Sequence, residues 1–115
     1  MFTLVWTAEA REAYDELWAK AEKSRAARQA KGRKKSSKAE GLFKQVHKAV
    51  MMLRSNPKHP GLQTHKYHSL PHLYKSRASV FTAYVQQNTP AANRIFWCYG
   101  PGADEITIMA ITPHA

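Results

Sequence analysis

The chain has 115 residues, which is long enough for one domain with a single hydrophobic core and too short for two. Hydrophobic residues make up 43% of it, a share that excludes a disordered chain, and no apolar run approaches the ~20 residues that cross a bilayer. The 18 Lys and Arg against 8 Asp and Glu give a net charge of +10, so we expect a negatively charged partner: RNA, DNA or an acidic protein.

The N-terminus and the cysteine content indicate a cytoplasmic protein. The first residues lack a basic region followed by an apolar one, so we expect no secretory signal. The single cysteine, Cys98, cannot form an internal disulfide, which suits a reducing compartment. We expect residues 1–115 to form one domain without membrane contact.

An apolar run at residues 2–6 predicts a short first strand, and the segment after it predicts a helix. Thr7 supplies an N-cap oxygen, and Glu9 lies in the first turn, where the helix dipole favours an anion. Five side chains then form one apolar stripe at helical spacing: Ala10, Tyr14, Leu17, Trp18 and Ala21. We expect this helix to run over roughly 8–30, because Gly32 weakens its continuation.

The segment 25–38 is strongly basic and contains no acidic or large apolar residue. Its seven positive side chains are Arg25, Arg28, Lys31, Arg33, Lys34, Lys35 and Lys38. Such a run is often only a solvated loop, but seven uncompensated charges in fourteen residues exceed what solubility requires. We therefore predict that this segment binds nucleic acid, in particular ribosomal RNA, without reading its sequence.

A second helix is predicted at about 38–55. Ser37 and Glu40 have the spacing of a capping box, in which each side chain satisfies a free backbone N–H at the helix start. The apolar stripe of this helix consists of Leu42, Val46, Ala49, Val50 and Leu53. Pro57 ends the helix, because it disfavours a helical conformation at the residue before it. The two helices should form an antiparallel hairpin with the basic segment at its tip.

The remainder of the chain predicts β-strands separated by turn residues. The runs are "LQTHKYHSL" (62–70), "SVFTAYVQ" (79–86), "RIFWCYG" (94–100) and "EITIMAIT" (105–112). The last two are apolar on both faces, a pattern typical of central strands covered by helices. The order of the elements predicts an α+β fold, in which the helical hairpin packs on one face of a twisted, mainly antiparallel sheet of four or five strands.

Several segments resemble the RelE/ParE superfamily of toxins from bacterial type II toxin–antitoxin systems. The segment "HPGLQTHK" is similar to the "P-x-L-x-x-x-K" segment of many members, and "NRIFW" is similar to their "YRIIY" strand. This resemblance implies that Lys66 and Arg94 stand at basic positions of the family. The ending "ITPHA" is similar to the terminal histidine or arginine of members that cut mRNA on the ribosome, which implies a catalytic role for His114.

Two features depart from the members related to YoeB. Those members follow the terminal histidine with a tyrosine, whereas Ala115 follows it here. Their acidic general base has no counterpart, because residues 65–94 contain no Asp or Glu. We therefore expect a site for RNA cleavage to use basic and imidazole groups, in the style of RelE or HigB.

RNA cleavage without a metal needs a base for the 2′-OH, an acid for the 5′ leaving oxygen and cations for the phosphate. We assign the acid or base role to His114, since histidine titrates near neutral pH. Arg94 and Lys66 are assigned to the phosphate, with Arg77 in support, and Tyr84 to base stacking or proton donation. A solvated side chain is the alternative for Lys66, because lysines are usually exposed.

We also expect His65 and His68 to contact nucleic acid on the sheet face that carries Lys66. With His72 they have spacings that would align three zinc ligands on a helix, but Pro71 and the β-type pattern argue against a helix there. No cysteine or carboxylate lies nearby to complete four ligands. The sequence therefore predicts neither a metal nor a cofactor.

Two alternatives remain open for the strand ends. Arg94 could pair with Asp104 or Glu105 across the hairpin turn, and His114 could be a frayed chain end. However, an antiparallel hairpin of the last two strands places Arg94 within a few residues of Thr112. This arrangement would bring the arginine and the histidine to the same end of the sheet.

These features lead to one function and two alternatives. The first is a ribosome-dependent mRNA endoribonuclease toxin, whose partners are mRNA, the ribosome and a cognate antitoxin protein. The second is a ParE-like inhibitor of DNA gyrase, which binds without catalysis. The third is a non-toxic member that binds only nucleic acid or protein. The terminal histidine and the basic sheet face favour the first, since gyrase binding does not require them.

Overall fold

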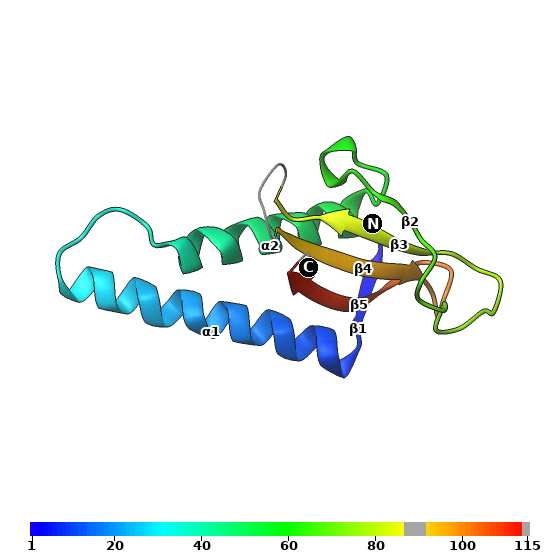
Figure 1. The fold of residues 1–115 in the computed structure, drawn as a ribbon, viewed down its shortest axis with the longest axis horizontal. Helices are drawn as coiled ribbons and strands as arrows, with labels where there is room; N and C mark the ends of the chain where they lie inside the picture. The colour runs from blue at the N-terminus through cyan, green and yellow to red at the C-terminus, as the bar shows by residue number, and fades with distance from the viewer. Residues whose placement is uncertain (87–91, 114–115) are drawn as a thin grey trace.

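The computed structural model describes residues 1–86 and 92–113, in which two helices pack on a five-stranded sheet (Figure 1). In chain order the elements are β1 (Thr3–Trp6), α1 (Ala8–Ala30), α2 (Lys38–Ser55), the 3₁₀ turn η1 (Pro60–Leu62), β2 (His65–Tyr67), β3 (Val80–Tyr84), β4 (Asn93–Tyr99) and β5 (Glu105–Pro113). The predicted α+β class and both predicted helices are confirmed. Within the described ranges, no helix is both long enough and apolar enough to cross a membrane.

The strands lie in the order β1-β5-β4-β3-β2. β1 pairs with β5 in parallel and the other neighbours are antiparallel, so the sheet is mixed but mainly antiparallel, as predicted. A register shift beside Phe96 and Trp97 leaves Met109 of β5 without an opposite residue. The Thr7 hydroxyl donates to the Met109 carbonyl at 2.8 Å and also accepts from the Ala10 N–H, so it joins the start of α1 to this bulge.

One face of the sheet is covered by α1 and α2. The core between the two layers consists of Ala10, Val46, Ala49, Val50, Leu53, Leu62, Ala83, Ile95, Trp97, Ile106, Ile108 and Ile111. Full burial of each large aliphatic side chain contributes about 1.5–3 kcal/mol relative to an exposed one, so this layer contact accounts for much of the folding free energy. Ile95 and Trp97 of β4 point to this face, which leaves the alternate residues of the strand for the other face.

The opposite face is covered in part by the segment between β2 and β3, residues 68–79, and not by a helix. The Tyr74 hydroxyl lies 2.8 Å from Thr107 Oγ1, and Thr107 in turn donates to the Gly100 carbonyl at 2.9 Å. Tyr74 is therefore the donor in the first bond, and this bond fixes the segment on the sheet. The helical hairpin therefore covers one face only, as predicted, and this loop covers part of the apolar second face of the central strands.

The strand predicted at 62–70 is only three residues long. Pro60 begins a 3₁₀ turn, and Gln63 adopts a left-handed conformation with φ of 45°, so the extended backbone begins only at His65. After Tyr67 the chain leaves the sheet and forms the segment that contains Pro71. The strand exists as predicted, but its ends are set by these local conformations.

The helical hairpin extends beyond the sheet on one side, with its tip at the far end (Figure 1). α1 ends before Gly32, whose φ is 68°, and the Arg33 N–H donates to the Arg28 carbonyl, as in a Schellman cap. α2 begins with the predicted capping box of Ser37 and Glu40. Local sequence signals thus define both ends of the tip.

Candidate nucleic-acid-binding and catalytic site

Arg94 lies near the start of β4, on the sheet face that α1 and α2 do not cover. It is opposite Tyr84 of β3 on one side and opposite Thr112 of β5 on the other. The predicted proximity of Arg94 and Thr112 is therefore confirmed. His114 lies outside the described residues, so its catalytic assignment stays a prediction.

The guanidinium of Arg94 lies against two aromatic rings. Its Cζ atom is 5.2 Å from the ring centre of Phe96 and 5.9 Å from that of Tyr67, distances typical of cation–π contacts. Nε is buried and has no hydrogen-bond partner within residues 1–86 and 92–113. A buried N–H without a partner costs about 1–3 kcal/mol, and the side chain as a whole is only partly buried, so a phosphate could meet the guanidinium from its open side.

The alternative in which Arg94 pairs with Asp104 or Glu105 is wrong. Both carboxylates lie at the opposite end of β4, beyond the last pair of the β4–β5 ladder. Glu105 instead accepts a hydrogen bond from the Gly102 N–H at 2.9 Å. Among the residues that the structure describes, no carboxylate forms an ion pair with Arg94. Within these residues no carboxylate neutralises its charge.

His65 of β2 lies on the same sheet face and contacts Tyr84, with 5.5 Å between the ring centres. Its Nδ1 is 3.0 Å from the Gln63 carbonyl oxygen. Because a carbonyl only accepts, Nδ1 carries the proton, and in the neutral ring the lone pair is on Nε2. This is the form in which a histidine acts as a general base. The side chain of His65 is exposed, so a substrate can reach it.

The sequence pattern alone indicates neither the His65–Tyr84 contact nor the Tyr67–Arg94 contact. Both depend on the register of β2, which sets His65 opposite Thr82 and Tyr67 opposite Val80. The available signal is the spacing of two residues between His65 and Tyr67, which places both side chains on one face of a strand. Which face that is depends on how the short strand pairs with β3.

Lys66 lies on the other face of the sheet. It is opposite Phe81, which packs against the core beneath the helices. Since successive side chains of a strand point to opposite faces, the sheet separates Lys66 from Arg94. The structure therefore does not bring together the two cations that the sequence assigns to one phosphate.

Arg77 and His68 lie in the segment that covers part of the Arg94 face. Together with Tyr67 and Val80 they line a hollow of ≈ 430 Å³ between this segment and the sheet. Tyr67 lines this hollow and also contacts Arg94. Arg94 itself does not border the hollow, so among the described residues Tyr67 is the one that Arg77 and His68 share with it.

No group of three or more His, Cys, Asp or Glu side chains in the described part of the chain could hold a metal ion. Nδ1 of His72 accepts hydrogen bonds from the N–H groups of Tyr74 and Lys75, both at 3.0 Å, and so stabilises a local turn. Cys98 is a buried free thiol. Burial raises the pKa of this thiol, and a hydrogen bond from the Leu73 backbone N–H opposes this with a smaller effect. The raised pKa makes the thiol a poor nucleophile.

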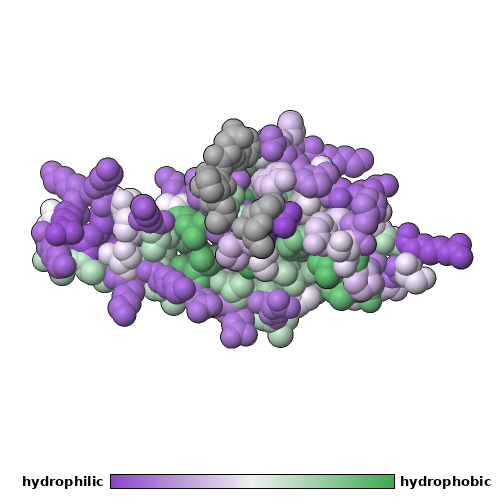
Figure 2. All heavy atoms as spheres, in the orientation of Figure 1, coloured by the Kyte–Doolittle hydropathy of each residue, from purple (hydrophilic) through white to green (hydrophobic). Residues whose placement is uncertain are grey.

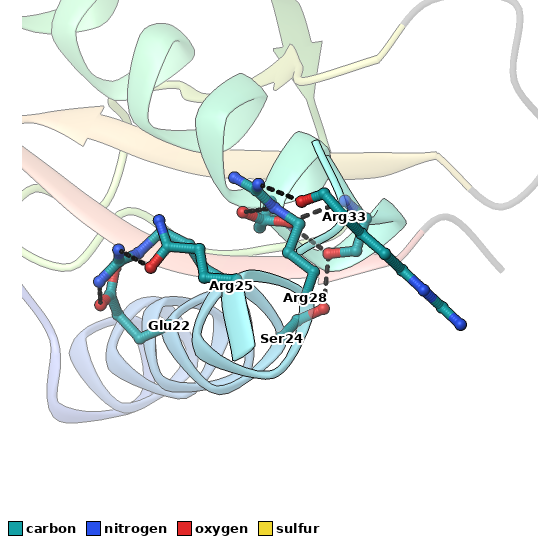
Figure 3. A network of polar contacts seen from close by, with 8 residues as sticks. Glu22, Ser24, Arg25, Arg28 and Arg33 are labelled. Atoms are coloured by element: carbon teal, nitrogen blue, oxygen red, sulfur yellow. Dashed lines mark hydrogen bonds and ion pairs between the residues drawn. The ribbon is translucent and has the colours of Figure 1, made fainter. Parts of the chain in front are cut away.

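Two of the basic side chains at the hairpin tip are neutralised (Figure 3). Arg28 and Glu40 form an ion pair at 2.9 Å, in which their side chains are only 20% and 11% exposed, and Arg25 pairs with Glu22 at 2.6 Å. Hydrogen bonds from Arg28, and then from the Ser37 backbone, lower the pKa of Glu40 to about 2. The expectation of seven uncompensated charges is wrong for these two arginines, because their partners come from outside the basic segment.

Five exposed cations remain at the tip without an ion pair among the described residues: Lys31, Arg33, Lys34, Lys35 and Lys38. The Arg33 side chain points away from the hydrogen-bonded network in Figure 3. Figure 2 shows hydrophilic residues gathered at this end of the molecule, whose longest dimension is 53 Å. The tip therefore presents a positive surface at a distance from the sheet.

Three solved structures resemble this chain over nearly its whole length, while no family sequence model and no curated protein sequence matches it. A YoeB/ParE toxin from Agrobacterium tumefaciens gives a TM-score of 0.59 at 10% identity, over 98% of this chain and 99% of the toxin. A YoeB dimer from Staphylococcus aureus gives a TM-score of 0.58 at 11% identity, over 99% of this chain and 98% of the YoeB chain. A copper-bound mutant toxin from Helicobacter pylori gives a TM-score of 0.54 at 14% identity, over 99% of this chain and 96% of that toxin. The chain therefore has the fold of RelE/ParE-superfamily toxins.

Proposed function

We propose that the protein is a toxin that cuts mRNA on the ribosome, without a metal, by attack of a 2′-OH on the adjacent phosphate. The observation that carries this proposal is Arg94, whose buried Nε has no partner in the described residues, which lies opposite Tyr84, and which is linked to His65 through the ring contact of Tyr84. A fixed cation beside titratable groups is what this reaction requires. The fold shared with YoeB/ParE-type toxins supports the same function.

In the proposed mechanism, Nε2 of His65 accepts the proton of the 2′-OH, and the 2′ oxygen attacks the phosphorus atom. Arg94 stabilises the negative charge on the phosphate oxygens through a bidentate contact. The bond between phosphorus and the 5′ oxygen then breaks, and His114 donates a proton to that oxygen. The products are a 2′,3′-cyclic phosphate and a 5′-OH end, so the reaction needs no further reactant.

The residues around these three position the RNA. Tyr84, which lies beside Arg94 and against the His65 ring, is proposed to stack on a base next to the scissile phosphate. Arg77 is proposed to add positive charge, and His68 a hydrogen-bonding imidazole, along the hollow that Tyr67 also lines. Lys66 takes no part in this mechanism, because it lies on the other face of the sheet.

The five exposed cations of the tip are proposed to bind ribosomal RNA through its phosphates. Their distance from the sheet would let the tip hold the ribosome while the Arg94 face engages mRNA. The remaining proposed partner is a cognate antitoxin protein, which would neutralise the toxin by covering the basic face around Arg94.

A function by binding alone is the second candidate, either as a gyrase inhibitor or as a non-toxic module. Two observations favour it: residues 65–94 contain no carboxylate base, and Ala115 stands where related toxins have a tyrosine. The lack of a carboxylate base does not exclude cleavage, because in the proposed mechanism His65 acts as the base.

Expression in a bacterium, with protein synthesis and mRNA integrity followed in time, separates the candidates. For an mRNA-cutting toxin we expect translation to stop and mRNA to be cut, and we expect Arg94→Ala to abolish both effects. Intact mRNA with a loss of DNA supercoiling would favour gyrase inhibition. Unchanged growth, translation and supercoiling would favour a non-toxic binding module.

A further inference from the structure

A second pocket lies on the face of the sheet opposite to Arg94, at the edge formed by β2. Its volume is ≈ 460 Å³. Sites for small ligands typically measure about 300–1,000 Å³, so the pocket can hold a ligand of moderate size. One wall is formed by aromatic side chains of β3 and β4, and the other by residues 57–60 and 63–66. Of the proposed cleavage residues in the described chain, only His65 borders it.

Phe81, Trp97 and Tyr99 form the aromatic wall. The rings of Phe81 and Trp97 stack with 4.7 Å between their centres and 24° between their planes, and Tyr99 stands edge-on to both. Phe81 is partly exposed and Tyr99 is 37% exposed, so both offer ring surface to the pocket. A planar aromatic group is therefore the ligand that this wall would bind best.

Trp97 also provides an unsatisfied hydrogen-bond donor. Its side chain is 1% exposed, and its Nε1 has no hydrogen-bond partner in the described part of the chain, although a buried indole N–H usually finds one. Because Nε1 is buried, a ligand acceptor would reach it only after the pocket wall rearranges around Trp97. Nucleobases carry such acceptors on their rings, whereas the aromatic side chains of a peptide other than histidine do not.

The rim of the pocket is positively charged. Lys58 and Lys66 border it and are exposed, and the described residues that line it include no carboxylate. Nδ1 of His59 accepts a hydrogen bond from the Gly61 N–H at 2.9 Å. In the neutral ring, Nε2 of His59 is therefore a donor. An anionic group attached to the aromatic one would be favoured at this rim.

We propose that this pocket binds a nucleotide, with its base on the wall of Phe81 and Tyr99 and its phosphate at Lys58 and Lys66. A nucleotide combines the planar ring, the ring acceptors and the anion that the three preceding features favour. The same chemistry is presented by a free nucleoside monophosphate and by the 5′-phosphorylated end of an RNA chain. The proposal does not depend on RNA cleavage, because the sheet separates the pocket from Arg94.

An NMR titration of the nitrogen-15-labelled chain with AMP tests the proposal. The indole N–H signals of Trp6, Trp18 and Trp97 are assigned through Trp6→Phe and Trp18→Phe. We expect AMP to move the Trp97 signal saturably and to leave the signal of the exposed Trp18 in place. Adenosine, which lacks the phosphate, should bind about tenfold more weakly, as expected for the loss of a charge-assisted contact. Inorganic phosphate alone should not move the Trp97 signal.

Two lysine variants and a second ligand sharpen the test. Lys58→Gln and Lys66→Gln should each weaken AMP binding about threefold, the scale of an exposed ion pair, whereas the matched variant Lys75→Gln should not. Tighter binding of a 5′-phosphorylated adenosine trinucleotide than of AMP would identify the RNA end as the ligand, and equal affinity would identify the free nucleotide. The proposal is overturned if millimolar AMP leaves Trp97 unmoved, or if Lys58→Gln and Lys66→Gln bind AMP like wild type.

The nucleotide-binding proposal and the cleavage proposal can be tested independently of each other. Lys58→Gln should cut mRNA at the wild-type rate, and Arg94→Ala should bind AMP with wild-type affinity. A wild-type protein that binds AMP but cuts no mRNA overturns the cleavage proposal and leaves the pocket in place. A protein that cuts mRNA while AMP leaves the Trp97 signal unmoved overturns the pocket and leaves the cleavage proposal in place.

Discussion

The hairpin tip and the Arg94 face are both positively charged, but they hold their charges in different ways. At the tip, Arg25 and Arg28 are neutralised by carboxylates and five other cations extend into solvent. On the sheet, Arg94 is partly buried against Phe96 and Tyr67, and its Nε has no partner among the described residues. Exposed cations attract a polyanion over a distance, whereas a held guanidinium fixes one phosphate. The tip therefore suits affinity, and the Arg94 face suits chemistry.

Among the tests of this contrast, loss of Arg94 is expected to have the largest effect, which is on the rate of RNA cleavage. Arg94→Ala should lower the cleavage of ribosome-bound mRNA by about 10²-fold or more, the scale on which removal of one transition-state contact acts. Arg94→Lys is the matched control, which keeps the charge without the fork and should recover part of the rate. Circular dichroism checks that both variants fold. A wild-type rate in Arg94→Ala would show that this face is not the site.

The two histidines should give effects of similar or smaller size, with different dependence on pH. His65→Ala and His114→Ala should each lower cleavage by about 10²-fold. Because the base must be neutral and the acid protonated, the wild-type rate should be bell-shaped in pH. His65→Ala should remove the fall in rate at low pH, where the base would be protonated. His114→Ala should remove the fall in rate at high pH, where the acid would be deprotonated. Rates measured over about pH 5–9 test this, and an unchanged bell in His65→Ala would contradict its role as base.

The tip should govern binding but not chemistry. Replacement of Arg33, Lys34 and Lys35 with Gln should weaken ribosome binding and reduce the slope of log affinity against log salt by about 2–3, since each lost phosphate contact removes somewhat less than one unit. The cleavage rate at saturating ribosome should not change. Arg25→Gln is the control, and it should alter the slope less because Glu22 already neutralises Arg25. An equal slope in the triple variant and wild type would identify the tip as a solvated loop.

The smallest effect concerns the stability of the tip at low pH. The pKa of Glu40 in the fold, about 2, lies below its ordinary value of 4.5. The ionised carboxylate therefore stabilises the fold above pH 4.5, and this contribution is lost as the pH falls from 4.5 towards 2. Glu40→Gln should lower Tm at neutral pH, and the two Tm values should converge near pH 2.

Glu22→Gln is the matched control for this stability measurement. The Arg25–Glu22 pair is more exposed, at 43% and 40% of its side-chain surfaces, so its loss should change Tm less than the loss of Glu40. A difference in Tm between wild type and Glu40→Gln that stays constant from neutral pH to pH 2 would contradict the ion-pair interpretation.

Local patterns in the sequence determined most of the fold. The cap at Thr7, the capping box of Ser37 and Glu40 and the break at Gly32 define the two helices, because each acts on backbone groups within a few residues. The alternation of β4 and β5 and the short turn between them place Arg94 beside Thr112, since an antiparallel hairpin leaves little freedom of register.

Only the tertiary structure decided which side chains meet. The short edge strand β2 takes its register from β3, and this register puts His65 on the Arg94 face and Lys66 on the opposite one. The partner of Arg28 comes from the next helix, and the cover of the second sheet face comes from the segment after β2. These contacts join residues that are distant along the chain, so no local spacing encodes them. They depend on the packing of whole elements, which the hydrophobic core sets.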